Sequence, residues 1–239
     1  MTKANDSKGH MSQFSLPGNP PIDVILRRSA RAKRLSLRMS QLDGRVTLTL
    51  PNKVPESQGM AFLREKETWL RSHLSKRDVD VAVALGTQIP VEGEMLRIEP
   101  GSGRSVQRSD GALRVPGPED RVAARVKGWL RTLARDRLAE ACDEYAQRLG
   151  RPYDRLTLRD TRSRWGSCTH DGGLMFSWRL ILADREILDY VAAHEVAHLA
   201  EMNHSPAFWA QVERIYGDWK PARTWLRENG AALHRFRFD

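Results

Sequence analysis

The sequence has little cysteine and no long apolar run. Its two cysteines, Cys142 and Cys168, stand far apart and form no CxxC pair, so we expect a reducing cytoplasm rather than a disulfide framework. No apolar stretch approaches the roughly 20 residues that a bilayer-spanning helix needs, and residues 1–20 lack the apolar core of a secretory signal. We therefore expect a cytoplasmic chain without membrane contact.

The balance of apolar and charged residues is typical of a folded protein. Apolar residues make up 40% and charged residues 29% of the 239 positions, which excludes wholesale disorder. The length suffices for one large domain or two small ones. The formal net charge of +9 favours anionic partners without naming one.

The first half of the sequence is rich in strand signals. We expect a flexible tail over residues 1–18 and a β-rich region with one helix over residues 19–117. The pair Asp43-Gly44 indicates a hairpin turn, after which apolar and polar residues alternate up to Leu50. Apolar positions at helical spacing predict the one helix over residues 56–76.

The second half, residues 118–239, is rich in helix signals. Pro118 opens a long helix that Gly150 closes. Further helices are expected over residues 184–201, 205–216 and 218–230, and short strands over residues 156–158 and 174–179. These patterns predict an α+β protein, in which a small N-terminal β-rich region precedes a helical domain with a short β-sheet.

The stretch most informative about chemistry begins at His194 and contains the pattern HExxH. His194 and His198 are four residues apart on an expected helix, so they lie on one face, one turn apart. Two imidazoles in that geometry can reach one Zn²⁺ at about 2.0–2.1 Å. Glu195 is rotated about the helix axis, outside the ligand set but close to a metal-bound water, where a general base acts.

A third ligand requires the helix to end soon after His198. Asn203 can take the left-handed conformation that ends helices, and Ser205-Pro206 is typical of the N-cap and first turn of a new helix. His204 would then sit at a sharp junction and turn back toward the other two histidines. Glu213 on the next helix is the alternative third ligand, as in peptidases that bind zinc through two His and one Glu. We expect one Zn²⁺ per chain.

Three motifs of the sequence resemble those of one known family. They are TRSRWGSC (residues 161–168), GLMFSWRL (residues 173–180) and the stretch of residues 189–209 that contains the histidines. Together they are similar to the YgjP-like metallopeptidase family, also described as predicted metal-dependent hydrolases. The likeness extends upstream to about residue 22.

The resemblance implies a zincin-type catalytic domain in the second half of the chain, with the short β-sheet beside the active-site helix. It implies zinc held by His194, His198 and His204, and Glu195 as the general base. It also implies kinship with SprT-like proteases, which act on proteins bound to DNA. The histidine spacing equals that of metzincins, but Glu201 stands where metzincins have glycine.

The residues around the motif predict hydrolysis of a peptide bond by a zinc-activated water. Glu195 is expected to take the proton of the water and pass it to the leaving amine. The oxyanion needs a further donor, and Arg162, Arg164 and Tyr216 are candidates for that role or for a substrate contact. The strand over residues 174–179 either pairs with an extended substrate or is an ordinary strand of the sheet.

We expect a peptide or protein substrate. Two basic segments are candidate contacts for a further partner. Residues 27–38 and 121–137 are rich in Arg and Lys, and these side chains either contact phosphates of DNA or RNA or form solvated faces. A nucleic-acid-associated zinc protein and a zinc module without turnover are therefore the alternatives to a peptidase. If a Glu195→Gln variant kept both its zinc and its hydrolysis, Glu195 would not be the base.

Overall fold

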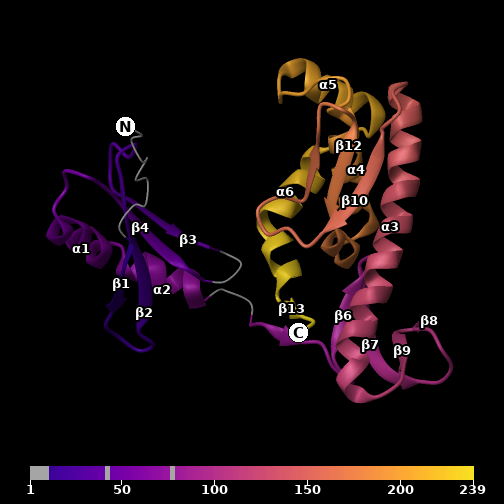
Figure 1. The fold of residues 1–239 in the computed structure, drawn as a ribbon, viewed down its shortest axis with the longest axis horizontal. Helices are drawn as coiled ribbons and strands as arrows, with labels where there is room; N and C mark the ends of the chain where they lie inside the picture. The colour runs from indigo at the N-terminus through magenta and orange to yellow at the C-terminus, as the bar shows by residue number, and fades with distance from the viewer. Residues whose placement is uncertain (1–10, 41–43, 76–78) are drawn as a thin grey trace, which may run out of the picture. The chain divides into compact units, whose positions relative to one another are not determined.

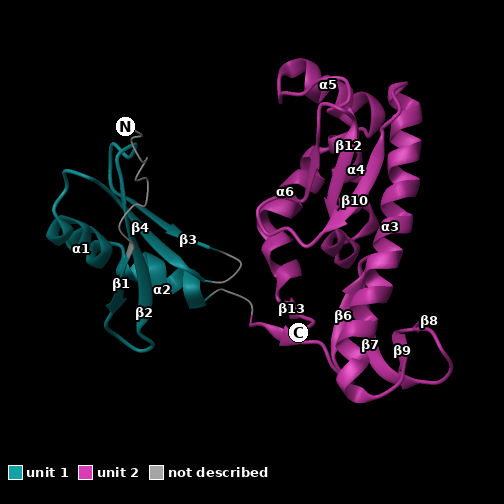
Figure 2. Cartoon of the chain, viewed as in Figure 1, with its two compact units in different colours: residues 1–78 teal, residues 79–239 magenta. Residues whose placement is uncertain are grey.

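The computed structural model describes residues 11–40, 44–75 and 79–239. The chain forms two compact units, residues 1–78 and residues 79–239 (Figure 1, Figure 2). Each unit has its own cluster of buried apolar side chains. Within the described part of the chain, no helix is long and apolar enough to cross a membrane.

The first unit is a four-stranded sheet that packs against two helices (Figure 1). Its elements are β1 (Met11–Leu16), β2 (Ile22–Ser29), β3 (Ser36–Met39), β4 (Val46–Pro51), α1 (Glu56–Glu65) and α2 (Glu67–Ser75). The strand order is β1-β2-β4-β3, with β2 and β4 parallel and the two outer pairs antiparallel.

One face of this sheet forms the core of the unit. Val46, Leu48 and Leu50 alternate along β4 with polar residues and are fully buried, as the sequence pattern predicts. A Cβ atom on Gly59 would lie 2.8 Å from the Leu50 side chain, so α1 packs directly on this face. Leu70 of α2 joins the same core.

The expected tail over residues 1–18 contains a strand. Residues 11–16 form β1, which pairs with β2 along its whole length. Leu16 is buried and Phe14 packs against the core, so two apolar residues in a polar stretch suffice to hold an edge strand. The polar residues around Phe14 and Leu16 hide this alternation when only composition is considered.

The helix expected over residues 56–76 is two helices. Lys66 ends α1 with φ −92° and ψ 4°, and α2 begins at the next residue. Both helices nevertheless direct apolar side chains to the sheet, which explains the helical spacing in the sequence. Asp43 of the expected hairpin turn lies outside the described residues, but β3 and β4 are antiparallel, as a hairpin requires.

The second unit combines three small sheets with a long helix and three shorter helices (Figure 1). Its first elements are β5 (Val81–Ala82), β6 (Gln88–Val91), β7 (Glu94–Gly101), β8 (Gln107–Ser109), β9 (Ala112–Pro116) and α3 (Val122–Leu149). They are followed by β10 (Arg155–Arg159), β11 (Gly166–Cys168), β12 (Gly173–Ser177), α4 (Arg185–Ala197), α5 (Pro206–Ile215), α6 (Lys220–Asn229) and β13 (Phe236–Arg237). The mixed α+β architecture predicted from the sequence is confirmed.

The division between the units precedes the predicted boundary near residue 118. Residues 79–117 contain the sheet β6-β7-β9-β8, and its side chains Ile89 and Leu113 are buried in the same core as Val126 of α3. Strand signals do give way to helix signals near residue 118. The core nevertheless continues across that point, and a core rather than a change of secondary structure defines a compact unit.

The second sheet lies beside α4 and has the order β10-β12-β11. β12 pairs with β10 in parallel and with β11 in antiparallel register, so both of its edges are occupied. The strand expected over residues 174–179 ends at Ser177, after which Trp178–Leu182 form a 3₁₀ helix. The central strand therefore cannot pair with a substrate, and the edge strand β11 is the one that borders the pocket described below.

A buried arginine ties the C-terminal segment to this sheet. Arg179 donates to Asp160 at 2.6 Å and to the carbonyl oxygens of Leu233 and Phe236 at 3.2 and 3.0 Å. Beyond these contacts, β13 pairs in parallel with β5, which begins the unit. The two ends of the second unit are thus joined.

Candidate metal centre

The two elements that carry the histidines meet at a sharp junction. α4 ends at Ala197, earlier than predicted, and His198 is its C-cap. α5 begins at Pro206, and the Ser205 side chain accepts a hydrogen bond from the Phe208 backbone N–H at 3.3 Å, so the predicted N-cap is confirmed. Asn203 is not left-handed, since among the described non-glycine residues only Glu92 has a positive φ.

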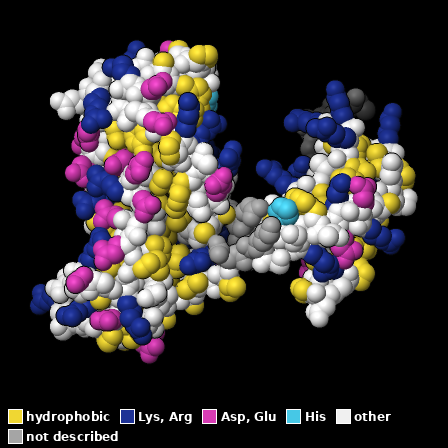
Figure 3. All heavy atoms as spheres, turned by 180° about the vertical axis from the view of Figure 1, so that it is seen from behind, with side chains coloured by type: hydrophobic (Ala, Val, Ile, Leu, Met, Phe, Trp, Pro, Cys, Tyr) yellow, Lys and Arg dark blue, Asp and Glu magenta, His cyan; other side chains and the backbone are white. Residues whose placement is uncertain are grey.

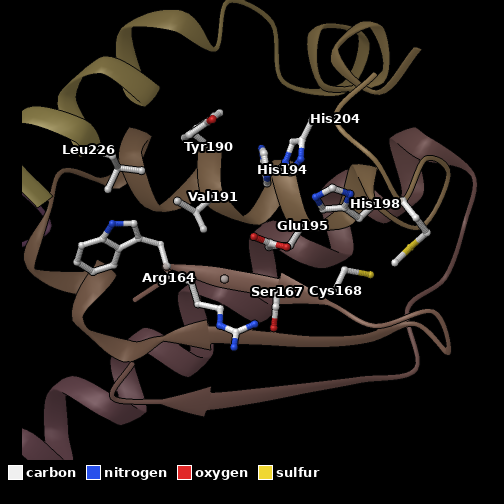
Figure 4. A pocket seen from close by; sticks show the side chains of 13 residues that line it. Arg164, Ser167, Cys168, Tyr190, Val191, His194, Glu195, His198, His204 and Leu226 are labelled. Carbon is white, nitrogen blue, oxygen red and sulfur yellow. Dashed lines mark hydrogen bonds between the residues drawn. The ribbon is translucent and has the colours of Figure 1, made fainter. Parts of the chain in front are cut away.

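Three imidazoles converge at this junction. The ring centroids of His194, His198 and His204 are 5.1, 5.0 and 4.8 Å apart in pairs, and one ligand atom of each ring lies within 4.8 Å of the others. Figure 4 shows the rings turned toward one another, with the Glu195 carboxyl group beside them. The helix supplies two rings at a spacing of four residues, and the junction returns the third.

The spacing of the ring nitrogens suits a small divalent cation. The Nε2 atoms of His194 and His204 are 3.0 Å apart. Two nitrogens bound to a tetrahedral Zn²⁺ at about 2.0–2.1 Å would lie about 3.3 Å apart. The Nδ1 atom of His198 contacts the Glu201 carbonyl oxygen at 2.9 Å, which makes Nδ1 the donor and leaves Nε2 as the acceptor for a metal.

Burial favours the neutral form of the His194 and His198 imidazoles, which is the form that binds metals. Burial lowers the pKa of His194 to about 3, and the neighbouring rings of His198 and His204 act in the same direction. Burial also lowers the pKa of His198, although its hydrogen bond with Glu201 opposes the change.

The Phe208 ring of α5 packs against all three histidine rings. Its ring is fully buried and stacks on His198 with centroids 4.4 Å apart. It also meets His194 and His204 with centroids 4.9 and 4.8 Å away. One side chain of α5 thus restricts the orientation of all three candidate ligands.

Glu195 lies on the neighbouring face of α4, against β11. It is 6% exposed, and burial raises its pKa to about 8 while Arg164 opposes that rise. A Cβ atom on Gly166 would lie 2.6 Å from its Oε1, so only glycine at this position leaves room for the carboxyl group. Gly166 belongs to the motif WGSC of the sequence. No helix or strand pattern, however, shows that this position must be glycine to leave space for the Glu195 side chain.

A pocket of about 410 Å³ opens over the histidines and Glu195. Its other walls include the strand β11, Arg164, Tyr190 and Leu226. Tyr190 precedes His194 by one helical turn, and the centroids of the two rings are 5.9 Å apart. Its spacing of four from His194 places it on the same face of α4.

Of the three candidate substrate contacts, one lies at the pocket. Arg164 lines the pocket, whereas Arg162 and Tyr216 do not. The Tyr216 hydroxyl donates to the Glu186 carbonyl oxygen at 3.1 Å and is engaged there. Glu213, the alternative third ligand, lies outside the cluster that the three histidines form.

Comparison with known proteins adds the family. The model of the YgjP-like metallopeptidase domain matches residues 33–229. The chain belongs to this family. The YgjP-like chain is also similar to a solved structure, "Crystal structure of the metallopeptidase zymogen of Pyrococcus abyssi abylysin", at 19% identity over 38% of this chain and 93% of that chain, with a TM-score of 0.35. No curated protein matches the YgjP-like chain.

Membership of a metallopeptidase family implies a metal ion and a peptide or protein substrate for this YgjP-like chain. The cluster of His194, His198 and His204 provides a place for such an ion. The family thus indicates the class of reaction, and the histidine cluster is the candidate place for it in the second unit.

Proposed function

We propose that this chain is a zinc-dependent peptidase whose ligands are His194, His198 and His204. The observation that carries the proposal is the convergence of three imidazoles within 4.8 Å of one another at one end of a 410 Å³ pocket. Three nitrogen ligands with a fourth position open to the pocket are typical of catalytic rather than structural zinc. When bound, zinc polarises the scissile carbonyl group and acidifies a water molecule.

Glu195 is the general base in this proposal. It accepts a proton from the water in the pocket and returns it to the leaving amine, so one carboxyl group serves both steps. Gly166 leaves the space that this carboxyl group occupies. Arg164, on the wall of the same pocket, is the positive side chain that would contact the carbonyl oxygen or a carboxylate of the substrate.

The edge of β11 is the proposed docking line for an extended substrate. Within the described residues β11 pairs only with β12, so its second edge has no strand partner. Ser167 and Cys168 of this strand line the pocket together with the histidines. A peptide that pairs with β11 would therefore pass directly over the candidate metal site.

Cleavage of a peptide library by the full-length protein, with zinc added and with a chelator, tests the proposal. We expect zinc-dependent cleavage, and for Glu195→Gln a loss of about 10²- to 10⁴-fold in kcat/KM with zinc retained. This nearly isosteric variant leaves the other residues that line the pocket, Tyr190 and Arg164 among them, as they are. Zinc binding without cleavage of any peptide would favour the zinc module without turnover.

A further inference from the structure

The net positive charge of the chain is concentrated in the first unit. Residues 1–78 hold 15 Lys and Arg against 7 Asp and Glu, whereas residues 79–239 hold 24 against 23. Residues 24–42 hold six of the basic side chains and no acidic one. Figure 3 shows Lys and Arg side chains projecting from the visible surface of this unit.

The register of the sheet places part of this charge on its open face. Arg27 of β2 lies opposite Thr49 of β4, and Arg38 of β3 lies opposite Thr47. Thr47 and Thr49 alternate along β4 with Leu48, which faces the helices, so all four side chains lie on the face away from α1 and α2. Arg27 and Arg38 are both exposed.

The connection between β2 and β3 extends this basic surface. Arg31, Lys33 and Arg34 are exposed there. Among the described residues, no carboxylate pairs with these three side chains or with Arg27 and Arg38. Asp23, at the start of β2, is the acidic residue on the open face. Five exposed cations therefore lie on the open face and in the connection that adjoins it, without a carboxylate partner among the described residues.

The uncharged residues of the open face suit phosphate groups. Thr47, Thr49 and Ser36 place hydroxyl groups between Arg27 and Arg38, and hydroxyl groups are common donors to phosphate oxygens. The face carries no aromatic side chain, since Phe14 lies opposite Val24 on the buried side. Proteins that hold single strands stack bases on aromatic rings, and this face lacks such a platform.

We infer that this surface binds the phosphate backbone of double-stranded nucleic acid, without reading its bases. The basic surface consists of Arg27, Arg31, Lys33, Arg34 and Arg38. It is independent of the proposed peptidase chemistry, because none of its residues lines the pocket of the second unit.

The second basic segment, residues 121–137, does not form a comparable surface. Arg137 donates to Glu92 at 2.6 Å and Arg121 lies near Asp120. Arg125 donates to the Arg104 carbonyl oxygen at 3.4 Å. Three of the six basic side chains of this segment thus contact the protein itself. Arg131 and Arg135 are exposed and serve as a matched control for removing two positive charges elsewhere.

Fluorescence anisotropy of a labelled 20-base-pair DNA duplex of arbitrary sequence with the full-length protein tests this inference. Five phosphate contacts predict a slope of about −4.5 for log K against log salt concentration, so affinity falls about 500-fold between 50 and 200 mM salt. In R27Q/R38Q we expect at least about tenfold weaker binding at 50 mM salt and a slope smaller by about 2. R131Q/R135Q should bind within about twofold of the wild type.

Three results would overturn the inference. They are no duplex binding at 50 mM salt, equal losses in R27Q/R38Q and R131Q/R135Q, and displacement of the duplex by poly-glutamate as readily as by unlabelled duplex. The last would mean that the partner is an acidic protein. A single strand of the same sequence should bind more weakly than the duplex, because it presents fewer phosphates and finds no ring to stack on.

Discussion

The two units use their charged residues differently. In the second unit, Arg108, Arg137 and Arg185 surround Glu92, and Arg179 joins Asp160. In the first unit, the arginines of β2, β3 and their connection have no carboxylate partner in the described structure. Positive charge that a unit pairs internally stabilises its fold, whereas unpaired charge on an open face is available to a partner.

The comparison predicts that neutralising a paired cation costs stability in the second unit. The largest effect is expected for Arg179→Met, because Arg179 is 7% exposed and its loss leaves Asp160 and two carbonyl oxygens without a donor. We expect a loss of about 3 kcal/mol in the free energy of unfolding, measured by urea denaturation. Arg237→Met, which removes a more exposed pair with Asp80, should cost less than about 1 kcal/mol. Equal costs for both variants would contradict the role given to Arg179.

A second contrast concerns two glycines of the second unit. Gly166→Ala would bring a methyl group against Glu195, so we expect kcat/KM to fall at least about tenfold while zinc is retained. Gly128→Ala in α3 meets no atom within 4 Å, and it should stabilise the helix by about 0.5–1 kcal/mol without changing activity. These predictions are tested by measuring kcat/KM for peptide hydrolysis and the midpoint of thermal unfolding of both variants. Full activity of Gly166→Ala would show that Glu195 does not need this space.

The ion pairs of Glu92 predict a dependence of stability on pH. Burial opposes the ionisation of Glu92, but the hydrogen bonds and charges of Arg137 and Arg108 outweigh it and hold its pKa below the ordinary value of 4.5. A lowered pKa stabilises the folded state above the unfolded-state pKa, and this contribution is lost as the pH falls through the folded-state pKa. Glu92→Gln should therefore cost about 1–2 kcal/mol at pH 7, and the difference from wild type should shrink below about pH 4. A difference that stays constant down to pH 3 would exclude this explanation.

The smallest effect on stability is expected in the first unit. R27Q/R38Q removes two exposed cations without partners, so its midpoint of thermal unfolding should stay within about 2 °C of the wild-type value. Its hydrolysis of a short peptide should also be unchanged, because the pocket lies in the second unit. A marked loss of either property would mean that these arginines act within the protein itself.

The candidate site was largely predictable from the sequence because helix geometry relates spacing to direction. A spacing of four residues from His194 to His198 places them on one face, and Ser205-Pro206 indicates where the next helix begins, so the return of His204 follows. The same rule places Tyr190, four residues before His194, on that face as well. Gly166 could not be found in this way, since its role depends on a contact across the fold with Glu195.

The fold was less predictable where it depends on contacts between distant segments. Alternation identified β4, but no local pattern indicates that β12 is central and β11 an edge. Likewise, the boundary between the units depends on residues 79–117 packing against α3, and this packing is not visible in a change of composition. Local periodicity thus predicts individual helices and strands. Which strands pair, and which segments share a core, depends on contacts that form only in the folded chain.

The most direct test of the central claim is the zinc content of the purified full-length protein, measured by mass spectrometry after dialysis against zinc-limited buffer. We expect about one zinc per chain in the wild type and in His170→Ala, whose imidazole is exposed and outside the cluster. We expect His204→Ala to retain little or no zinc under the same dialysis. Wild-type zinc content in His204→Ala would contradict the proposal that three imidazoles hold the ion.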